Sequence, residues 1–296
     1  MPATILVRYG ELALKSPPVR REFERTLQRN IVEQFRTEGR ACRLTADHGH
    51  LYVMTEEPAP AVRILRRVFG ITSVSVVTEV PTDRAEITRV LLNVADPLLS
   101  PGRRFAIRAR RTGSHNFTSQ GLARDLGSEV LEKWPDRGLI VDLDHPDVEL
   151  NVEVRGPKTY LYVDRHSGPG GLPLGVAGRV VALVDGPRGA LGAFLMMKRG
   201  CRCAFVPTLE GERLTRDVLA RFDPQARVER ISTDPVATLE SVAESTHADA
   251  VVLPLPVESY PESRQRWGDR VLFSPTVGFN EQEVGRRWQN VEELAA

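Results

Sequence analysis

The chain has 296 residues, a formal net charge of +1 and a pI of about 7.8, and its length allows two or three domains, each with its own core. This balance excludes a globally basic protein, so any binding of nucleic acid would need a local basic cluster. The sequence has no run of about 18 apolar residues and no signal-peptide core, which predicts a soluble, cytoplasmic protein without membrane contact.

The first 80 residues alternate between strand-like and helix-like patterns. In order, they predict a strand, a helix, two hairpin strands, a helix and a strand at residues 4–8, 17–35, 41–46, 51–55, 62–69 and 72–80. Pro17 and Pro18 suit the start of the first helix, and Gly70 ends the second. The order βαββαβ predicts a ferredoxin-like domain, with two helices on one face of a four-stranded sheet.

The middle third contains the most basic strand of the chain. Asp83 is a candidate N-cap for a helix that Asp96-Pro97 ends, and a strand follows at Arg103–Arg111. The apolar residues of this strand alternate, which places three side chains in a row on the opposite face: Arg104, Arg108 and Arg110. The loop 112–120 adds hydroxyls, an amide, an imidazole and an aromatic ring. Arginines for phosphates beside a stacking ring predict an RNA-binding surface.

The same arginine pattern is also typical of a solvated strand face followed by a helix-capping loop. Apolar residues then predict a helix over 122–134 and strands at 148–154 and 159–163. A glycine- and proline-rich linker at 166–175 marks the clearest boundary. We therefore expect three domains, at residues 1–80, 81–166 and 176–296.

Beyond the linker, strand-like and helix-like segments alternate. Strands are predicted at 180–184, 204–206, 228–231, 250–255 and 271–273, and helices at 190–199, 214–222, 235–245 and 280–288. Alternating βα units predict a doubly wound, Rossmann-like parallel sheet with helices on both faces. The whole chain is thus predicted to be α/β, with an α+β N-terminal part, and a ligand is expected at the carboxyl ends of the parallel strands.

The turn that follows the first of these strands, at 184–190, is the default ligand site. Free backbone N–H groups at the start of the next helix suit a phosphate. The candidate residues for a nucleotide or another anion are Asp185, Gly186, Arg188 and Gly189. Two residues oppose this use, since Pro187 lacks an N–H and Asp185 places a negative charge where a phosphate would lie.

Cysteine and histidine spacing gives no support for a metal site. The three cysteines are an odd number, and Cys201 and Cys203 form one CxC pair without the second pair that zinc needs. The six histidines are scattered, and the nearest two, His48 and His50, belong to a predicted hairpin turn. We assign no metal ligand. The strong preference for arginine over lysine suits phosphate contacts, but it also follows from a GC-rich genome or a hot habitat.

Three stretches, in the right order, resemble the tRNA 4-thiouridine synthetase (tRNA sulfurtransferase) family over nearly the whole chain. They are YGELALK at 9–15, FAIRARRTGSHNFTSQ at 105–120, and GPGGLPLG at 168–175 followed by FLMMKRG at 194–200. The resemblance implies a ferredoxin-like domain, a THUMP domain that grips the acceptor end of tRNA, and a pyrophosphatase-type (PP-loop) ATP-binding domain. It also implies a homodimer.

The resemblance places RNA contacts on the THUMP domain. Together with the arginine row, it gives the candidate RNA-binding residues Arg104, Arg108, Arg110, Arg111, Thr112, Ser114, His115, Asn116 and Phe117. Lys15, in the YGELALK loop, is a further candidate for RNA contact or for joining the first two domains.

The turn at 184–190 departs from the family pattern where the chemistry is expected. The family's ATP loop reads Ser-Gly-Gly-x-Asp-Ser-Pro, and an ungapped alignment sets VDGPRGA against it. Only Gly186 matches, and Arg188 replaces the acid that serves Mg²⁺-ATP. Family members use ATP to adenylate a uridine carbonyl before sulfur replaces its oxygen. We therefore expect an ATP site that is lost or altered, and we assign no catalytic residue.

Three functions remain open. The first is a tRNA-binding protein that has lost or altered its thiolation site and acts beside an active paralogue. The second is a working sulfurtransferase that makes 4-thiouridine with ATP and Mg²⁺; Arg188 would bind the phosphates, and Cys201, Cys203 or a sulfur-donor protein would handle sulfur. The third is a C-terminal domain that binds another anion or serves as a dimerisation scaffold.

Overall fold

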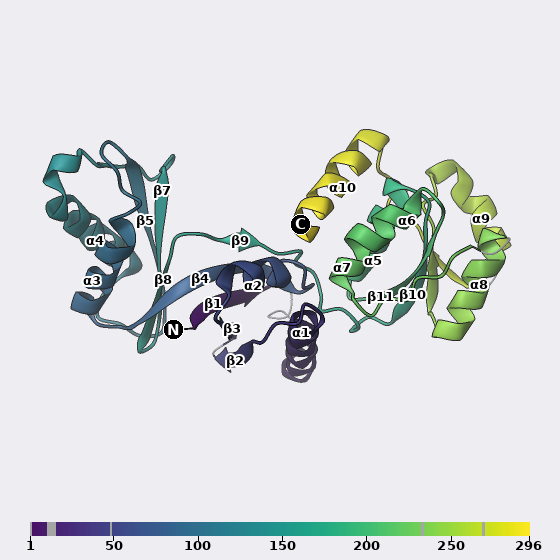
Figure 1. Ribbon diagram of the computed structural model, residues 1–296, viewed down its shortest axis with the longest axis horizontal. Helices are drawn as coiled ribbons and strands as arrows, with labels where there is room; N and C mark the ends of the chain where they lie inside the picture. Colours follow the sequence, from purple (N-terminus) through teal and green to yellow (C-terminus); the bar gives the residue numbers. More distant parts are fainter. Residues whose placement is uncertain (1, 11–15, 48, 232–233, 268–269) are drawn as a thin grey trace. The chain divides into compact units, whose positions relative to one another are not determined.

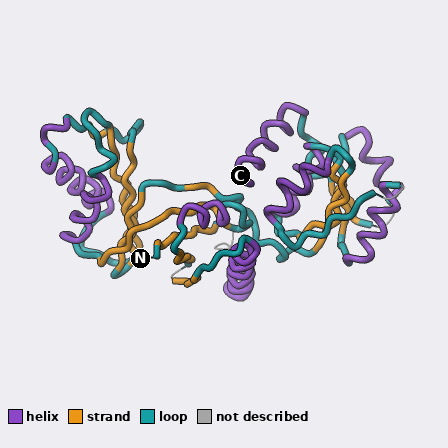
Figure 2. The backbone as a smooth tube through the Cα atoms, viewed as in Figure 1, coloured by secondary structure: helices purple, strands orange, loops and turns teal. Residues whose placement is uncertain are grey.

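The computed structural model describes residues 2–10, 16–47, 49–231, 234–267 and 270–296, and Figures 1 and 2 trace its elements. The chain forms two compact units, one with residues up to 6, 52–58 and 75–166, the other with residues 7–51, 59–74 and 167–296. Domain boundaries at 80, 166 and 176 stay predictions. None of the helices in the described ranges is both long and apolar enough to span a membrane.

The N-terminal elements have the predicted βαββαβ order (Figure 1). They are β1 (Ala3–Tyr9), α1 (Pro17–Thr37), β2 (Arg43–Asp47), β3 (His50–Thr55), α2 (Pro58–Leu65) and β4 (Ile71–Pro81). Two prolines begin α1, and Leu27, Ile31 and Phe35 form its buried stripe. Gly70 closes the turn after α2 with a φ of +98°, which glycine adopts without steric cost. These elements confirm the ferredoxin-like prediction.

The next group of elements contains the arginine-rich strand. Its members are α3 (Arg84–Ala95), β5 (Arg104–Thr112), α4 (Ser119–Lys133), η2 (Pro135–Arg137), β6 (Ile140–Val141), β7 (Val148–Arg155), β8 (Lys158–Tyr162) and β9 (His166–Ser167). The side chain of Asp83 caps α3 by accepting a hydrogen bond from Glu86 N, and Thr118 caps α4 in the same way through Gly121 N. The sequence patterns did not predict β6, since its two residues are exposed and show no alternation.

Strand pairing leaves one edge of β5 largely open. The hydrogen-bonded order is β2-β3-β1-β4-β8-β7-β5-β6, with β9 paired to β4. On one side, β5 pairs in parallel with β7 from Phe105 to Thr112, but on the other it pairs with β6 only at Arg104 and Phe105. Beyond Phe105, no strand in the described part of the chain covers that edge, so its outward backbone groups remain available.

The C-terminal domain is built on four parallel strands in the order β11-β10-β12-β13. Its strands are β10 (Arg179–Val184), β11 (Arg202–Pro207), β12 (Ala250–Val252) and β13 (Val271–Phe273). Its helices are α5 (Pro187–Lys198), α6 (Gly211–Leu214), η3 (Thr215–Leu219), α7 (Ala220–Phe222), α8 (Pro235–Thr246), η4 (Val257–Ser259), α9 (Tyr260–Arg266) and α10 (Glu281–Ala295). Among these helices, η3 is a π-helix.

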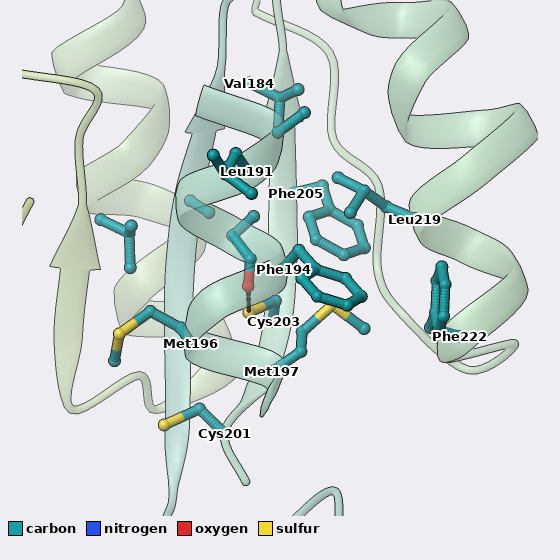
Figure 3. Packing of buried hydrophobic residues seen from close by; sticks show 14 of the residues in the cluster. Val184, Leu191, Phe194, Met196, Met197, Cys201, Cys203, Phe205, Leu219 and Phe222 are labelled. Carbon is teal, nitrogen blue, oxygen red and sulfur yellow. Dashed lines mark hydrogen bonds between the residues drawn. The ribbon is translucent and has the colours of Figure 1, made fainter. Parts of the chain in front are cut away.

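Helices cover both faces of this parallel sheet. Ala182 and Val184 of β10 belong to an apolar cluster with α5, η3 and α10, and Figure 3 shows the part around Phe194 and Phe205. Val181, which points to the opposite face, belongs to a second cluster with α8. The doubly wound parallel-sheet prediction is therefore confirmed.

Two predicted segments differ from the structure. The expected strand at 228–231 is reduced to one isolated bridge between Val228 and Phe205. Val228 is 46% exposed at the border of the sheet, and the nearby Arg227 and Arg230 are exposed, so a longer pairing would bury little apolar surface. The last helix is longer than expected, because Val291 and Ala295 continue its buried stripe to the end of α10.

Candidate nucleic-acid interface and nucleotide turn

A groove of about 1080 Å³ follows the open edge of β5. One wall is α4, and the other includes the segment 141–143. Its charged side chains are Arg108, Arg110, Arg124, Arg165 and Glu149, so positive charge predominates. Val141 and Leu143 add apolar surface that is 48% and 57% exposed. The groove combines guanidinium groups, open backbone and apolar side chains, which suits a single-stranded nucleic acid.

The three arginines of the row differ in their partners. Arg104 forms ion pairs with Asp147 at 3.1 Å and with Asp142 at 3.4 Å. These pairs, with Asp147 contributing first, raise the pKa of Arg104. Arg108 lies 3.0 Å from Glu149 through its Nε. Arg110 is exposed and has no hydrogen bond or ion pair to any described residue, so it is the member of the row most available to a phosphate.

The loop after β5 is held by Gly156, from the turn between β7 and β8, and by the side chains of Arg111 and His115. Thr112 O accepts a hydrogen bond from Gly156 N, and the His115 ring lies 3.1 Å from the same oxygen. Arg111 donates to Gly113 O at 3.2 Å, next to a backbone turn with a φ of +96° at that glycine. Ser114 and Asn116 are exposed. The loop therefore presents polar groups from a fixed backbone.

The aromatic ring predicted to stack on RNA has protein partners. Phe117 stacks on His115 with the ring centroids 5.3 Å apart, and it also packs against the apolar core beneath β5. Both side chains are partly buried. Phe117 thus has a structural contribution in addition to its predicted RNA contact. Lys15, the remaining RNA candidate, lies outside the described residues.

The sequence patterns did not predict two of the groove residues. Arg124 lies on α4, and Asn151 lies beside Arg108 because β5 and β7 pair in register. An exposed arginine on the helix after the basic strand was the available signal for Arg124. Nothing in the sequence indicated Asn151, because its position beside Arg108 depends on strand pairing.

The turn at the carboxyl end of β10 joins a strand to a helix, and its backbone is tightly packed. Gly186 is the N-cap of α5, with φ +157° and ψ −165°, and no side chain caps the helix. A Cβ on Gly189 would lie 2.7 Å from both Leu183 O and Asp185 Oδ1. The Asp185 carboxylate therefore lies against the first turn of α5, where an anion would otherwise approach.

Arg188 points away from this turn toward the C-terminal segment. Its Nη1 donates to Thr276 O and its Nη2 donates to Phe279 O, each at 2.8 Å. Nη2 also contacts Glu281 Oε1 at 2.7 Å, at the start of α10. The guanidinium is mostly buried, with 18% of the side chain exposed. It ties α5 to α10, and its donors already have acceptors.

The pocket beside the turn is acidic. It has a volume of about 810 Å³ and contains Asp185, Glu210 and Glu212 against one basic side chain, Arg230. Desolvation, followed by the charge of Glu210, raises the pKa of Asp185, although the residue as a whole is exposed. Glu212 forms ion pairs with Arg216 and Arg230, and Arg230 makes the larger contribution to its lowered pKa. This charge balance opposes binding of a triphosphate.

Cys201 and Cys203 are buried and lie at the opposite end of the sheet from the turn, because Cys203 pairs with Val180 at the start of β10. Cys201 Sγ donates to Ala177 O at 3.3 Å, and Cys203 Sγ lies 3.6 Å from Ala193 O (Figure 3). Burial raises the pKa of both thiols, and that of Cys203 lies well above its ordinary value. A thiol must ionise to act as a nucleophile, so neither geometry favours sulfur transfer. The described residues contain no group of three metal-ligating side chains.

Comparison with known proteins identifies the first two domains. The ThiI ferredoxin-like domain matches residues 4–75, and the THUMP domain matches residues 81–164. In these domains, the chain belongs to the tRNA sulfurtransferase family. The C-terminal domain adds the four-stranded parallel sheet.

Two curated relatives carry the name "Probable tRNA sulfurtransferase". The protein of Methanothermobacter thermautotrophicus is 41% identical over 208 residues, which cover 68% of this chain and 51% of the relative. The protein of Methanocaldococcus jannaschii is 31% identical over 255 residues, which cover 81% of this chain and 66% of the relative. The chain thus spans about half the length of the first of these relatives.

Two solved structures share the fold along the chain. PH1313 from Pyrococcus horikoshii has a TM-score of 0.80 and 25% identity, with 98% of this chain and 99% of that chain covered. A 4-thiouridine synthetase solved with RNA and bound ATP has a TM-score of 0.75 and 22% identity, with 100% and 86% covered. At this identity, the second match supports the fold alone.

Proposed function

We propose that this sulfurtransferase relative binds the acceptor region of tRNA through the groove between β5, α4 and residues 141–143, which we call the THUMP groove, and does not use the turn at 184–190 for Mg²⁺-ATP. The observation that carries the proposal is the contrast between two arginines. Arg110 lines an open basic groove without a protein partner, whereas Arg188 is engaged by two carbonyls and a carboxylate. We therefore expect the groove to bind RNA, whereas nucleotide binding at the turn is disfavoured.

The groove has the features that single-stranded RNA ends require. Its guanidinium groups can contact phosphates, and the open edge of β5 offers backbone donors and acceptors. Exposed apolar side chains at Val141 and Leu143 provide surface for unstacked bases. Glu149 holds Arg108 in place, so part of the groove is preorganised before RNA binds. Arg104, which does not line the groove, is held in the same way by Asp147.

The turn, in contrast, lacks the parts of an ATP site. Asp185 Oδ1 lies against the helix start, Arg188 is bound elsewhere, and the adjacent pocket has an excess of carboxylates. Cys201 and Cys203 are buried thiols rather than exposed thiolates. We infer a recognition subunit that acts beside an active sulfurtransferase, with a second copy of this chain as its expected partner.

ATP-dependent tRNA thiolation is the second candidate. Its support is the fold shared with the 4-thiouridine synthetase that was solved with RNA and ATP, which covers this whole chain. That function would require Arg188 to leave Thr276 O and Phe279 O and turn toward a phosphate.

Calorimetry separates the two functions. Mg²⁺-ATP is titrated into the protein with and without unmodified tRNA, and tRNA alone is titrated in parallel. We expect a tRNA signal and no ATP signal. ATP binding in the micromolar range, followed by thiolation of tRNA, would establish the second candidate and overturn the proposed one.

A further inference from the structure

A second basic site lies in the compact unit that contains residues 7–51, 59–74 and 167–296, and its lining residues are not those of the turn at 184–190. It is a pocket of about 380 Å³ that contains four arginines: Arg63, Arg67, Arg216 and Arg221. Two arginines come from α2 and the turn after it, and two come from η3 and α7. We name it the four-arginine pocket.

The walls of the four-arginine pocket are fixed by direct contacts. Gln34 Nε2 on α1 donates to Arg221 O at 3.0 Å and to Phe222 O at 3.1 Å. Phe69, after α2, packs with its ring centroid 5.2 Å from that of Phe194 and 5.5 Å from that of Phe222. These contacts join the segments that carry the arginines, so the guanidinium groups converge in the folded chain without a ligand.

Acidic groups compensate only part of this charge. The lining contains one carboxylate side chain, that of Glu38, and Arg216 also forms an ion pair at 2.7 Å with Glu212, which lies outside the lining. Arg67 pairs with Glu38 at 2.6 Å, and Arg221 donates to Ala295 O at 2.9 Å. Arg63 is exposed and has no hydrogen bond or ion pair to any described residue. An excess of positive charge therefore remains within the pocket.

One of these cations is buried with an unsatisfied donor. Arg67 is only 7% exposed, and its Nε has no hydrogen-bond partner among the described residues. A buried guanidinium without its full set of acceptors is unfavourable, and an anion in the pocket would offset this cost.

A π-helical turn places the other two arginines together. Arg216 and Arg221 are five residues apart, and the π-helix Thr215–Leu219 lies between α6 and α7. In a regular α-helix, residues five apart point about 140° away from each other. The wider winding of a π-helix brings residues five apart closer to the same side of the helix, and such turns are frequent at functional sites. The π-helix thus helps to bring Arg216 and Arg221 into the same pocket.

We propose that the four-arginine pocket binds a phosphate group. Guanidinium groups match phosphate oxygens with paired hydrogen bonds, and the pocket offers little apolar surface for any other class of ligand. The phosphate could belong to the backbone of a bound RNA or to a small phosphate compound. The first source rests on the proposed tRNA binding, but the second does not.

Inorganic pyrophosphate is the first probe, titrated by calorimetry into the whole chain. Arg63→Gln and Arg216→Gln should each weaken its binding about tenfold, the usual effect of losing one charge-assisted hydrogen bond. The control is Arg286→Gln, since Arg286 is an exposed arginine of α10 without a described partner, and it should leave the affinity unchanged. Glu38→Gln should have the opposite effect and tighten binding several-fold, because it removes a negative charge but keeps an acceptor for Arg67.

Measurements of tRNA binding by the same variants identify the source of the phosphate. If the pocket contacts RNA, Arg63→Gln and Arg216→Gln should each reduce the salt slope of tRNA binding by about one. If they change only pyrophosphate binding, the ligand is a small phosphate compound. The proposal is overturned if neither probe responds to these two substitutions more than to Arg286→Gln. Failure of the THUMP proposal would give a separate result, because Arg110→Ala would then leave tRNA binding unchanged.

Discussion

Individual arginines in this chain differ by their partners rather than by their sequence context. Arg188 gives hydrogen bonds to Thr276 O and Phe279 O, so its guanidinium acts as a structural tie. Arg110 and Arg63 have no described partner and line basic cavities. The same residue type thus stabilises the fold in one place and remains free for an anion in another.

Replacing Arg188 by alanine should destabilise the protein. The variant loses a mostly buried guanidinium and leaves two carbonyl oxygens without their donor, which costs about 1–3 kcal/mol of unfolding free energy. Urea denaturation measures this loss as a lower midpoint. Arg286→Ala, on an exposed site of α10, should stay within about 0.5 kcal/mol of the parent. Unchanged stability together with lost ATP binding would show that Arg188 serves a nucleotide instead.

Elements of the C-terminal domain meet at glycines that leave no room for a side chain. Gly211, at the start of α6, lies against the carboxyl end of β10, and a Cβ there would be 1.7 Å from Val184 O. Gly189 in α5 has similarly close neighbours in the same strand. Contacts this close explain why glycine, and no larger residue, fits at positions 189 and 211.

Gly211→Ala should therefore disturb the junction between β10 and α6. The new methyl group clashes with backbone rather than with a flexible side chain, so we expect a loss of at least about 2 kcal/mol in unfolding free energy. Thermal unfolding followed by circular dichroism provides the measurement. Gly285→Ala is the matched control, because nothing lies within 4 Å of its Cβ position on α10, and alanine should stabilise that helix by up to about 1 kcal/mol. Equal effects of the two substitutions would rule out the steric explanation.

Element prediction succeeded where a short-range pattern decides the structure. The cap at Asp83 and the buried stripe of α1 follow from neighbouring residues, so the helices α3 and α1 could be placed from sequence. The segment at 228–231 failed because its β-branched residues lie at a sheet border with little to bury. Strand formation there depends on a neighbour that the local sequence does not describe.

Charge is segregated across the molecule despite its net value of +1. The THUMP groove and the four-arginine pocket have an excess of arginine, whereas the pocket beside the turn at 184–190 has an excess of carboxylates. Polyanions should therefore bind at particular sites and not over the whole surface.

Salt dependence tests this distribution. The logarithm of tRNA affinity should fall with the logarithm of salt concentration by about 0.7 to 0.9 for each phosphate contact. Arg110→Ala should reduce that slope by about one. Arg89→Ala, which removes an arginine of α3 that is paired with Glu86, should leave the slope unchanged. These values come from filter binding at several salt concentrations, and a flat response of the parent protein would favour a solvated strand face without RNA.

The sequence by itself determined the order of elements, the ferredoxin-like and parallel-sheet architectures, and the basic row of β5, because periodicity, caps and breakers act over a few neighbouring residues. The family motifs extended this to a THUMP domain. Only the tertiary structure decided the partners of these residues. It ties Arg188 to a segment about 90 positions away, and it brings Arg63 and Arg216 to one pocket from opposite parts of the chain. Contacts over such separations arise from packing, which no local pattern specifies.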